Sequence, residues 1–389
     1  PKSFTRGFGT SSYQIEGATK EDGRGESIWD RFATIPGKTH NGEDGEPGTD
    51  SYHRWREDIA ILKELGATAY RFSIAWPRIL PNGTGAVNQK GLAWYQQFVD
   101  GLLEAGIEPF PTLYHWDLPQ ALQDRGGWPA RDTAKAFADY AGIVLGALGD
   151  RVTRWSTLNE PLCSAWLGHL SGDMAPGIQD VQAAFSASHH LLLGHGMAVR
   201  AMRAAAPKIE VGIVLNVGPG IPATDSDADR EAVRRHDMTD SGWFHDPLYF
   251  GTYPQEAIDF SGVKMPIESD DMKIISEKLD WHGLNYYFPA KIGDDPMGGG
   301  ARTTWNHIDG PKTDMGWGMN AGVMRDFLIK LKDHWKAPKI YITENGSAWP
   351  DRIGADGGVH DPEREAYLMD HLTAAAEALD AGVDLRGYF

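Results

Sequence analysis

The sequence predicts an α/β protein in which eight parallel strands close into a (β/α)8 TIM barrel. Short apolar runs alternate with amphipathic runs along all 389 residues, which is the pattern of strand and helix units joined by right-handed crossovers. Polar residues follow almost every apolar run, as they do at the mouth of a barrel. The alternative, an open doubly wound sheet, is disfavoured because such a sheet binds its ligand at one switch point.

Eight apolar runs are expected to be strands, and six amphipathic runs between them are expected to be helices. Residues 51–65 illustrate the helical pattern, because Tyr52, Trp55, Ile59 and Leu62 recur at helical spacing and Gly66 follows. The expected strands are 6–12, 67–74, 107–115, 152–159, 209–217, 280–287, 339–343 and 384–389, and the expected helices are 51–65, 94–104, 132–148, 181–205, 322–334 and 362–380.

Four segments rich in glycine, proline and aspartate are expected to be loops: 36–50, 218–229, 293–314 and 349–361. Long loops in a compact domain are usually functional, and those after the sixth and seventh strands would wall a pocket at the carboxyl face of the barrel. No change of composition and no flexible linker divides the chain. We therefore expect a single catalytic domain over residues 1–389.

Composition narrows the classes of partner. The 54 acidic and 37 basic residues give a formal charge of −17, which repels phosphate backbones and anionic lipid, so nucleic acid is not expected as a partner. No apolar run is long enough to suggest a membrane span. Cys163 is the one cysteine and cannot form an internal disulfide, and no leader-like segment opens the chain; both favour the cytoplasm.

Two of the expected strands end in a glutamate. The run 151–158 leads to Glu160 and Pro161, and proline favours an extended residue before it and ends a central strand. The run 339–343 leads to Glu344. One such glutamate would ordinarily be a solvated strand-end residue. Two with matching surroundings are what acetal hydrolysis needs, because one carboxyl group gives a proton while the other meets the electron-poor carbon.

Other expected strand ends also carry polar side chains, and a closed barrel would bring them to one mouth. Polar residues at six strand ends favour a shared site over unrelated surface residues. The 14 tryptophans agree with a sugar ligand, because flat rings beside polar groups stack on sugar faces. The polar or aromatic residues at these strands are Gln14, Arg71, His115, Trp116, Asn159, Asn285 and Tyr287.

Six segments in this order resemble glycoside hydrolase family 1, the β-glucosidase family. The likeness runs from about Gly9 to the last residue, and it implies a (β/α)8 barrel of retaining β-glycosidases. The segments are Ser12-Tyr-Gln-Ile-Glu-Gly17, Tyr70-Arg-Phe-Ser-Ile-Ala-Trp-Pro-Arg78, His115-Trp-Asp-Leu-Pro119, Thr157-Leu-Asn-Glu-Pro161, Gly283-Leu-Asn-Tyr-Tyr287 and Ile342-Thr-Glu-Asn-Gly346.

The resemblance implies roles for the residues of these segments. Glu160 matches the family's acid/base and Glu344 its nucleophile, and retention requires the two carboxyl groups about 5 to 5.5 Å apart. Their pKa values must then differ, with Glu160 protonated and Glu344 ionised. Arg71 is the candidate cation for Glu344, with a structural ion pair as the alternative, and Tyr287 is the candidate phenol donor. Since the thioglucosidase branch carries glutamine in place of Glu160, O-glycosides are the expected substrates.

The remaining matches are implied to bind substrate. Gln14 and His115 match residues that hydrogen-bond hydroxyls of the non-reducing sugar, and Asn159 matches the amide that holds the 2-hydroxyl. Trp116 would form part of the pocket wall, and Asn285 would lie behind the pocket. The expected substrates are small β-D-glucosides, either cello-oligosaccharides or aryl and alkyl glucosides.

No cofactor and no metal is expected. Three histidines, at positions 189, 190 and 195, lie in an apolar helical run and do not form the His-Glu-x-x-His pattern of a zinc site. They are expected to be core residues.

The sequence departs from the family at two places. Residues 4–7 include a threonine and an arginine where family members usually carry apolar and aromatic residues, so the entry of the first strand is expected to be shifted or exposed. Residues 383–389 look like the start of the eighth strand, and the family's next segment, with a tryptophan, a sugar-gripping glutamate and the last helix, is expected to be missing. A barrel without that segment would expose apolar surface, at about 25 cal/mol per Å².

Two other functions stay open on these grounds. A truncated barrel could be a catalytically weak carbohydrate-binding protein. A 6-phospho-β-glycosidase is the other, since its phosphate grip lies in the segment after residue 389, although the acidic chain disfavours a phosphorylated substrate.

Overall fold

The computed structural model describes residues 4–298 and 300–389. Eight strands form a closed barrel in the order β1-β11-β10-β7-β5-β4-β3-β2, which confirms the predicted fold class. Each strand lies at one of the eight expected runs. The strands are β1 (Thr5–Gly9), β2 (Ala69–Ser73), β3 (Glu108–Tyr114), β4 (Arg154–Asn159), β5 (Glu210–Val217), β7 (Trp281–Tyr286), β10 (Lys339–Glu344) and β11 (Leu385–Tyr388).

The parallel register fixes which side chains share a level at the carboxyl ends. Strand β2 pairs with β3 over its whole length, from Ala69 opposite Glu108 to Ser73 opposite Thr112. Strand β3 continues to Tyr114, which lies opposite Leu158 of β4. The residues after these strands therefore emerge side by side.

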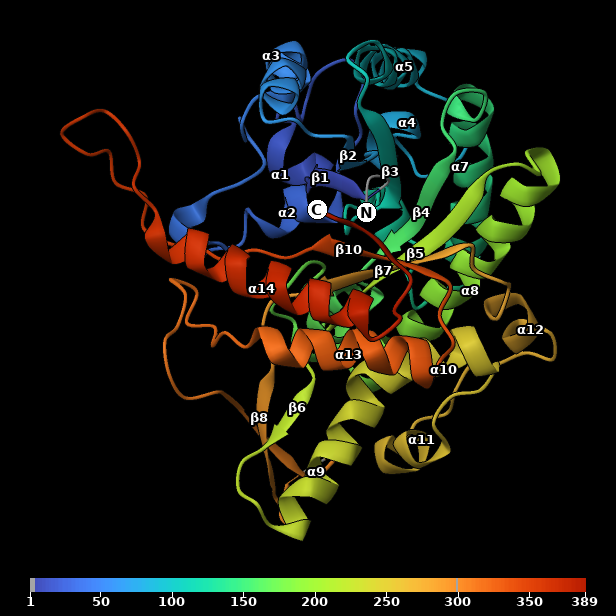
Figure 1. Cartoon of the computed structure of the whole chain (residues 1–389). Coiled ribbons are helices and arrows are strands. Elements are labelled where there is room, and N and C mark those ends of the chain that lie inside the picture. Colours follow the sequence, from blue (N-terminus) through green and yellow to red (C-terminus); the bar gives the residue numbers. More distant parts are fainter. Residues whose placement is uncertain (1–3, 299) are drawn as a thin grey trace. The chain divides into compact units, whose positions relative to one another are not determined.

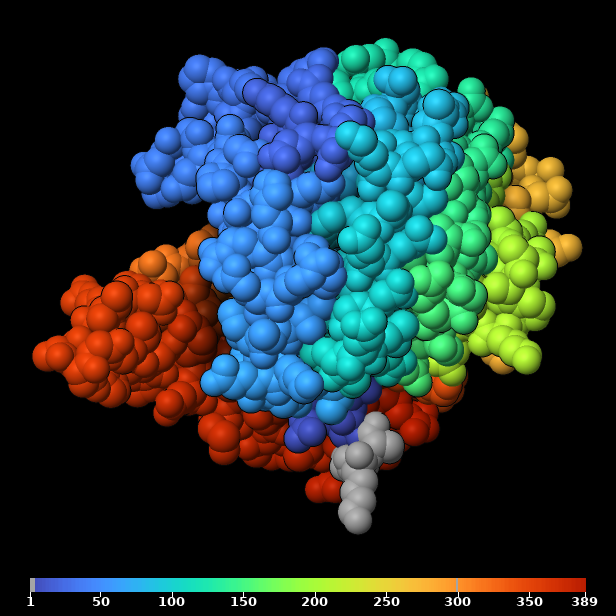
Figure 2. Space-filling view, turned by 90° about the horizontal axis from the view of Figure 1, so that it is seen from above, coloured from blue at the N-terminus to red at the C-terminus, as the bar shows by residue number. Residues whose placement is uncertain are grey.

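The chain forms two compact units, one of residues 4–215, 263–282 and 389, the other of residues 216–262 and 283–388. In the first unit, helices α3, α5 and α7 follow one another along the outside of β2, β3 and β4 (Figure 1). Figure 2 shows this surface passing from blue through cyan to green in chain order. The long helices of this unit are α3 (Ser51–Glu64), α5 (Gln89–Glu104), α7 (Arg131–Leu148) and α8 (Val181–Ala205).

Helix α5 begins five residues before the predicted start at residue 94. Its first turn contains Gln89 and Lys90, so the apolar period that marks the helix in the sequence is visible only from Trp94 onward. The other three long helices of the first unit match their predicted ranges to within one residue at each end.

The three histidines of α8 are core residues, as predicted. His189 Nε2 lies 2.9 Å from Asp271 Oδ2, and His195 Nδ1 lies 2.7 Å from Thr157 Oγ1 of β4. Burial lowers the pKa of His195 to about 3. The imidazole is therefore neutral at ordinary pH and ties α8 to the barrel strand that leads to Asn159.

In the second unit, α13 (Ala321–Asp333) and α14 (Pro362–Asp380) lie side by side (Figure 1), and Arg325 Nη1 and Glu377 Oε2 are 2.8 Å apart between them. Both helices lie where the sequence predicts them. The expected loop 349–361 has no helix and only an isolated bridge between Ile353 and Val359.

Three of the four expected loops are not wholly loops: the short helix η1 (His40–Gly42) lies within 36–50, and the loops 218–229 and 293–314 contain strands. A three-stranded sheet in the order β6-β8-β9 takes residues from both 218–229 and 293–314, and its strands are β6 (Gly220–Pro222), β8 (Ala290–Asp294) and β9 (Thr303–His307). Helix α9 (Asp227–Asp237) packs Ala232 and Val233 against Ala290 and Ile292. The prediction failed because these strands have only three to five residues, too few for a period to show, and because α9 covers the apolar residues of β8. Residue 299 lies outside the described part.

Many short helices were not predicted, because three to eleven residues are too few to show a helical period. Proline or glycine lies in or beside several of them. They are α1 (Ser12–Ile15), α2 (Ile28–Phe32), η1 (His40–Gly42), α4 (Trp76–Ile79), α6 (Gln120–Gln123), η2 (Cys163–Ser171), α9, η3 (Met238–Gly242), α10 (Trp243–Phe250), α11 (Gln255–Ser261) and α12 (Asp271–Ile275).

The entry of β1 is exposed, as the polar residues there predict. Arg6 is exposed, and 44% of Phe8 is accessible to solvent. Among residues 4–298 and 300–389, no helix has both the length and the apolar character that crossing a membrane requires.

Candidate active site

Asn159, the last residue of β4, is the centre of a buried hydrogen-bond network in the first unit. Its Oδ1 accepts a 2.5 Å hydrogen bond from Arg71 Nη2, and its Nδ2 lies 3.1 Å from His115 Nε2. Its backbone carbonyl accepts from Trp116 Nε1 at 3.1 Å. Asn159 is fully buried, and Arg71 and His115 nearly so. Arg71 of β2 and two residues of the turn after β3 thus hold Asn159 through both its side-chain amide and its backbone carbonyl.

The network follows from the strand order. Because β2, β3 and β4 are neighbours in register, the residues at their carboxyl ends lie within reach of one another. Trp116 has a φ of +76°, in the left-handed region that a tryptophan rarely adopts. This turn directs its indole N–H back to the carbonyl of Asn159.

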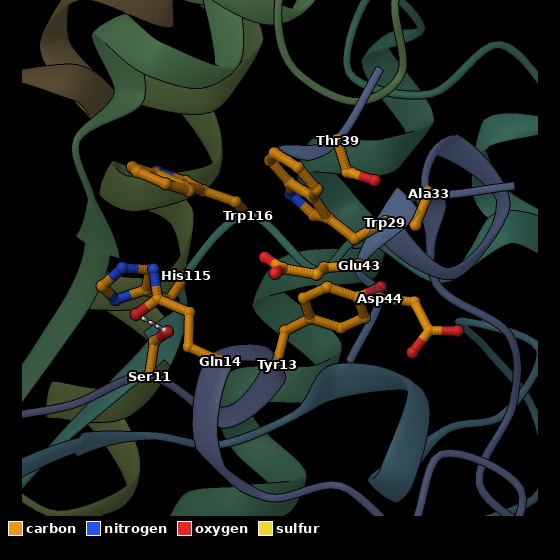
Figure 3. A pocket seen from close by; sticks show the side chains of 10 residues that line it. All are labelled: Ser11, Tyr13, Gln14, Trp29, Ala33, Thr39, Glu43, Asp44, His115 and Trp116. Atoms are coloured by element: carbon orange, nitrogen blue, oxygen red, sulfur yellow. Dashed lines mark hydrogen bonds between the residues drawn. The ribbon is translucent and has the colours of Figure 1, made fainter. Parts of the chain in front are cut away.

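Gln14 lies on the one-turn helix α1 and faces a cavity of about 240 Å³ together with His115 and Trp116 (Figure 3). Ser11 Oγ donates a 2.8 Å hydrogen bond to Gln14 Oε1, which leaves the amide NH2 of Gln14 directed away from that contact. The structure therefore brings together three of the residues that the sequence predicted as sugar-binding.

The same cavity contains residues that the sequence did not predict for the site. Trp29 of α2 stacks on Trp116 with ring centroids 6.4 Å apart, and Tyr13 packs against Trp29 at 6.1 Å. The carboxylate of Glu43 extends between these rings and the side of the cavity with His115 (Figure 3). The full lining is Ser11, Tyr13, Gln14, Trp29, Ala33, Thr39, Glu43, Asp44, His115 and Trp116.

Glu160 directly follows β4, as predicted, but the expected extended geometry is wrong. Its φ is +48°, because the chain passes from β4 to a helical segment beginning at Pro161 through this single residue. Its N–H donates to Val214 O at 2.9 Å, and its carbonyl accepts from Cys163 N at 3.0 Å. A left-handed non-glycine residue costs on the order of 1–3 kcal/mol, and such residues cluster at functional sites.

The Glu160 side chain is buried, with 5% of the residue exposed. Its Oε2 accepts a hydrogen bond from Cys163 Sγ at 3.2 Å. Cys163 lies three residues further on, at helical spacing, and this spacing is the signal from which the contact could have been predicted. The one cysteine of the chain is therefore a neighbour of the candidate acid/base.

In the second unit, Glu344 is the last residue of β10. Its Oε2 accepts a 2.6 Å hydrogen bond from the phenol of Tyr287, which follows β7. This is the contact expected from the family resemblance. The ring of Trp317, which the sequence did not predict for the site, packs against Tyr287 with centroids 5.4 Å apart.

Asn285 is fully buried on β7 and accepts a 2.7 Å hydrogen bond from Thr343 Oγ1 of β10. Asn345 donates to Tyr286 O at 2.6 Å and lies 2.9 Å from the phenol oxygen of Tyr367 of α14. These bonds fix the backbone on both sides of Glu344. The side chain of Asn285 lies in the core between two strands, consistent with its expected place behind a pocket.

The predicted residues thus form two groups, each within one unit. The first holds Gln14, Arg71, His115, Trp116, Asn159 and Glu160, and the second holds Asn285, Tyr287 and Glu344. In the first group, Arg71 donates to Asn159, a contact that the sequence did not predict. Its role as a cation for Glu344 stays a prediction.

A closed parallel barrel with glutamates at the carboxyl ends of two strands, amid amides, a histidine and tryptophans, defines a barrel enzyme of the glycosidase class. The chain belongs to glycosyl hydrolase family 1, whose model matches residues 1–389.

Curated relatives and solved structures of this family resemble the whole chain. It is 45% identical to a beta-glucosidase of an Agrobacterium species and 46% identical to beta-glucosidase A of Thermotoga maritima, covering 100% of this chain and 85% and 87% of those proteins. The structure of virulence factor SghA from Agrobacterium tumefaciens matches with a TM-score of 0.97 at 45% identity, covering 100% of this chain and 87% of that one. The Thermotoga maritima beta-glucosidase in complex with glucoimidazole matches with a TM-score of 0.97 at 46% identity, covering 100% of this chain and 88% of that one.

Proposed function

We propose that this chain is a retaining β-glucosidase that removes terminal non-reducing β-D-glucosyl residues from cello-oligosaccharides or from aryl and alkyl β-glucosides. The observation that carries the proposal is the hydrogen bond from Tyr287 to Glu344 at the end of β10, because it orients a carboxylate at the position of the family nucleophile. Relatives named beta-glucosidase, at 45% and 46% identity over the whole chain, support glucose as the sugar.

In the first step, Glu344 attacks the anomeric carbon of the bound glucoside. The bond from that carbon to the leaving oxygen breaks, and Glu160 gives its proton to that oxygen, so that the aglycone leaves as an alcohol. Glu160 is buried, and its Oε2 accepts a hydrogen bond from Cys163 Sγ, which holds the carboxyl group in place for the proton transfer. The product of this step is a glucosyl ester of Glu344.

In the second step, Glu160 is ionised and acts as a base. It takes a proton from water, the water oxygen forms a bond to the anomeric carbon, and the ester bond to Glu344 breaks. Two inversions give net retention, so β-glucose is released. For this mechanism the two carboxyl groups must lie about 5 to 5.5 Å apart across one sugar.

The groups around Asn159 would bind the sugar. Asn159 is held by Arg71 and His115, so its amide meets the 2-hydroxyl without reorganisation as charge develops in the transition state. Gln14 and His115 would hydrogen-bond the hydroxyls further from the cleaved bond, and Trp116 would stack on the ring. We also propose a cytoplasmic enzyme acting on products of cellulose degradation, on the grounds of the one cysteine and the implied substrates.

Two alanine variants test the assignment, with Glu104→Ala, an exposed glutamate at the end of α5, as the control. Glu344→Ala should lose turnover of both cellobiose and 4-nitrophenyl β-glucoside, because both steps need the nucleophile. Glu160→Ala should lower kcat/KM for cellobiose by about 10²–10⁴-fold. It should lower kcat/KM for the nitrophenyl substrate much less, because nitrophenolate leaves without protonation.

Sodium azide separates the two roles. With Glu160→Ala, azide should attack the glucosyl ester and give β-glucosyl azide, whereas with Glu344→Ala it should occupy the nucleophile's place and give the α-anomer. Proton NMR distinguishes the products. Initial release of α-glucose by the unaltered protein would exclude retention, and full activity of Glu344→Ala would exclude the proposed nucleophile.

A further inference from the structure

Asp117 is a buried carboxyl group that the proposed mechanism does not use. It follows His115 and Trp116 directly and is 0% exposed. Its Oδ2 accepts a 2.8 Å hydrogen bond from Ser12 Oγ, across 105 positions in the sequence. Its Oδ1 is also buried and has no hydrogen-bond partner among the described residues.

Ser12 is the first residue of α1, the single helical turn that carries Gln14. Its N–H donates to Ser73 Oγ at 2.7 Å, and Ser73 Oγ donates to Ser12 Oγ at 3.0 Å. A chain of hydrogen bonds, Ser73 to Ser12 to Asp117, therefore joins the carboxyl end of β2, the start of α1 and the end of β3. All three side chains are buried.

The two turns that this chain joins depend on contacts outside themselves. Helix α1 has four residues, too few for a stable helix without outside contacts. The turn after β3 contains Trp116 with its φ of +76°, a conformation that persists only when the surroundings hold it. On the other side of α1, Glu16 is held by Arg78 Nε at 3.0 Å and by Tyr95 Oη at 2.5 Å.

We propose that Asp117 is a positioning residue that, through Ser12, fixes the turn of Gln14 against the turn of His115 and Trp116, so that these three side chains meet one sugar together. The inference rests on the proposed function, which assigns the three side chains to sugar binding. It adds Asp117 to the proposed site as a residue that does not touch substrate but acts through Ser12 and Gln14.

Because Asp117 is a buried acid, we expect the positioning of these two turns to depend on pH. Burial raises the pKa of this carboxyl group to about 7; the hydrogen bond from Ser12 and the charge of Arg24 lower the pKa, and the charge of Glu16 raises it. Ionisation would place a negative charge out of contact with water, and the groups that favour the charged form, which include the backbone N–H of Asp117 itself, do not offset that burial. The two turns are therefore best held together below about pH 7.

Three variants test the proposal by their effect on kcat/KM and on the inhibition constant of glucose, a ligand that does not titrate. Asp117→Ala and Ser12→Ala should each raise the inhibition constant and lower kcat/KM by about 5- to 50-fold, the equivalent of one or two misplaced hydrogen bonds. Asp117→Asn keeps an acceptor for Ser12 and should remain within about threefold of the parent. In the parent, the glucose inhibition constant should rise above pH 7, and in Asp117→Asn it should not.

The control is Asp271→Ala, which removes another buried carboxylate of the same unit, one that pairs with Arg131 and His189. It should lower the melting temperature without changing the glucose inhibition constant. A double-mutant cycle with Gln14→Ala gives a second measurement: if Asp117 acts through Gln14, Asp117→Ala should cost much less in the Gln14→Ala background.

The proposal is wrong if Ser12→Ala and Asp117→Ala bind glucose as the parent does. It is also wrong if the effects in the cycle are additive, or if Asp271→Ala changes the glucose inhibition constant as much as Asp117→Ala does. If Asp117→Ala does not fold, Ser12→Ala and the pH comparison with Asp117→Asn still decide it. Absence of turnover in the parent would instead defeat the proposed function, and calorimetric binding of cellobiose would then measure the positioning effect without catalysis.

Discussion

Asn159 shows how single side chains are constrained at this site. Its Oδ1 accepts from Arg71, so its Nδ2 must face His115, and His115 Nε2 is then the acceptor in that pair. The proton of a neutral His115 therefore lies on Nδ1. The amide is locked in one orientation before any ligand binds, which is the preorganisation that stabilises a transition state more than a ground state.

Tyr287→Phe removes one hydrogen bond and nothing else from the candidate nucleophile. The phenol lies 2.6 Å from Glu344 Oε2, and hydrogen bonds to charged groups contribute about 1.5–3 kcal/mol. We expect kcat to fall by about 10- to 100-fold, with the melting temperature nearly unchanged because only an oxygen is lost. Stopped assays with 4-nitrophenyl β-glucoside measure this. An unchanged kcat would mean that the phenol does not orient the nucleophile.

Residue identities at the site were predictable from the sequence where the residue lies inside a strand-end motif. Gln14, His115 and Glu344 all do, and the structure gives each a place beside other site residues. Trp29 and Trp317 lie in separate segments with no periodic signal, and only tertiary packing brings them to Trp116 and Tyr287. The left-handed φ of Glu160 was not predictable, because proline alone favours the opposite geometry.

At the scale of elements, the strands of the barrel and the long helices were predictable because each has enough residues for its period to show. The sheet β6-β8-β9 was not, since β6 has three residues and β9, with the sequence Thr-Thr-Trp-Asn-His, has no buried residue and no alternation of apolar with polar side chains. The apolar residues of β8 are covered by α9, which follows β6 directly but lies far before β8 in the sequence.

Ile292 holds that sheet to α9, so Ile292→Ala should loosen both. It is fully buried against Ala232 and Val233, and truncation of a buried isoleucine to alanine costs about 2–5 kcal/mol. We expect faster trypsin cleavage at the exposed Arg302, near β9. Mass spectrometry of the first fragments identifies the site. The matched exposed change, Ile353→Ala, in a side chain 79% exposed, should leave cleavage unchanged.

The hydrogen bond between His195 of α8 and Thr157 of β4 predicts how the free energy of unfolding depends on pH. Burial holds the pKa of His195 near 3, below its ordinary value of 6.5, so the unfolded chain binds this proton more readily. Stability from this group is fully present above pH 6.5 and is lost as pH falls towards 3. Between pH 6.5 and 5 the loss is about 2 kcal/mol, at about 1.4 kcal/mol per pH unit.

His195→Gln should therefore be less stable than the parent at pH 7 but should lose less stability on acidification to pH 5. Urea denaturation at both values measures the difference. His360→Gln is the control, because that imidazole is 74% exposed and its replacement should leave the pH dependence of the parent intact. An identical slope in His195→Gln and parent would show that this histidine does not control acid stability.

At the scale of the whole molecule, the charge of −17 bears on which sugar the enzyme accepts. A glucoside with a 6-phosphate carries about two negative charges, and a strongly acidic protein repels it over roughly a Debye length, about 30 Å at 10 mM salt and 8 Å at 150 mM. Neutral cellobiose experiences no such force.

We therefore expect kcat/KM for cellobiose to exceed that for cellobiose phosphorylated at its non-reducing glucose, and the difference to shrink as salt rises from 10 to 150 mM. Salt screens the repulsion, so only the rate for the phosphorylated substrate should increase, while the rate for cellobiose stays constant and serves as the internal control. A higher kcat/KM for the phosphorylated sugar at both salt concentrations would mean that a local cationic site outweighs the net charge, and would favour a 6-phospho-β-glycosidase. Binding of both sugars without turnover of either would favour a carbohydrate-binding barrel.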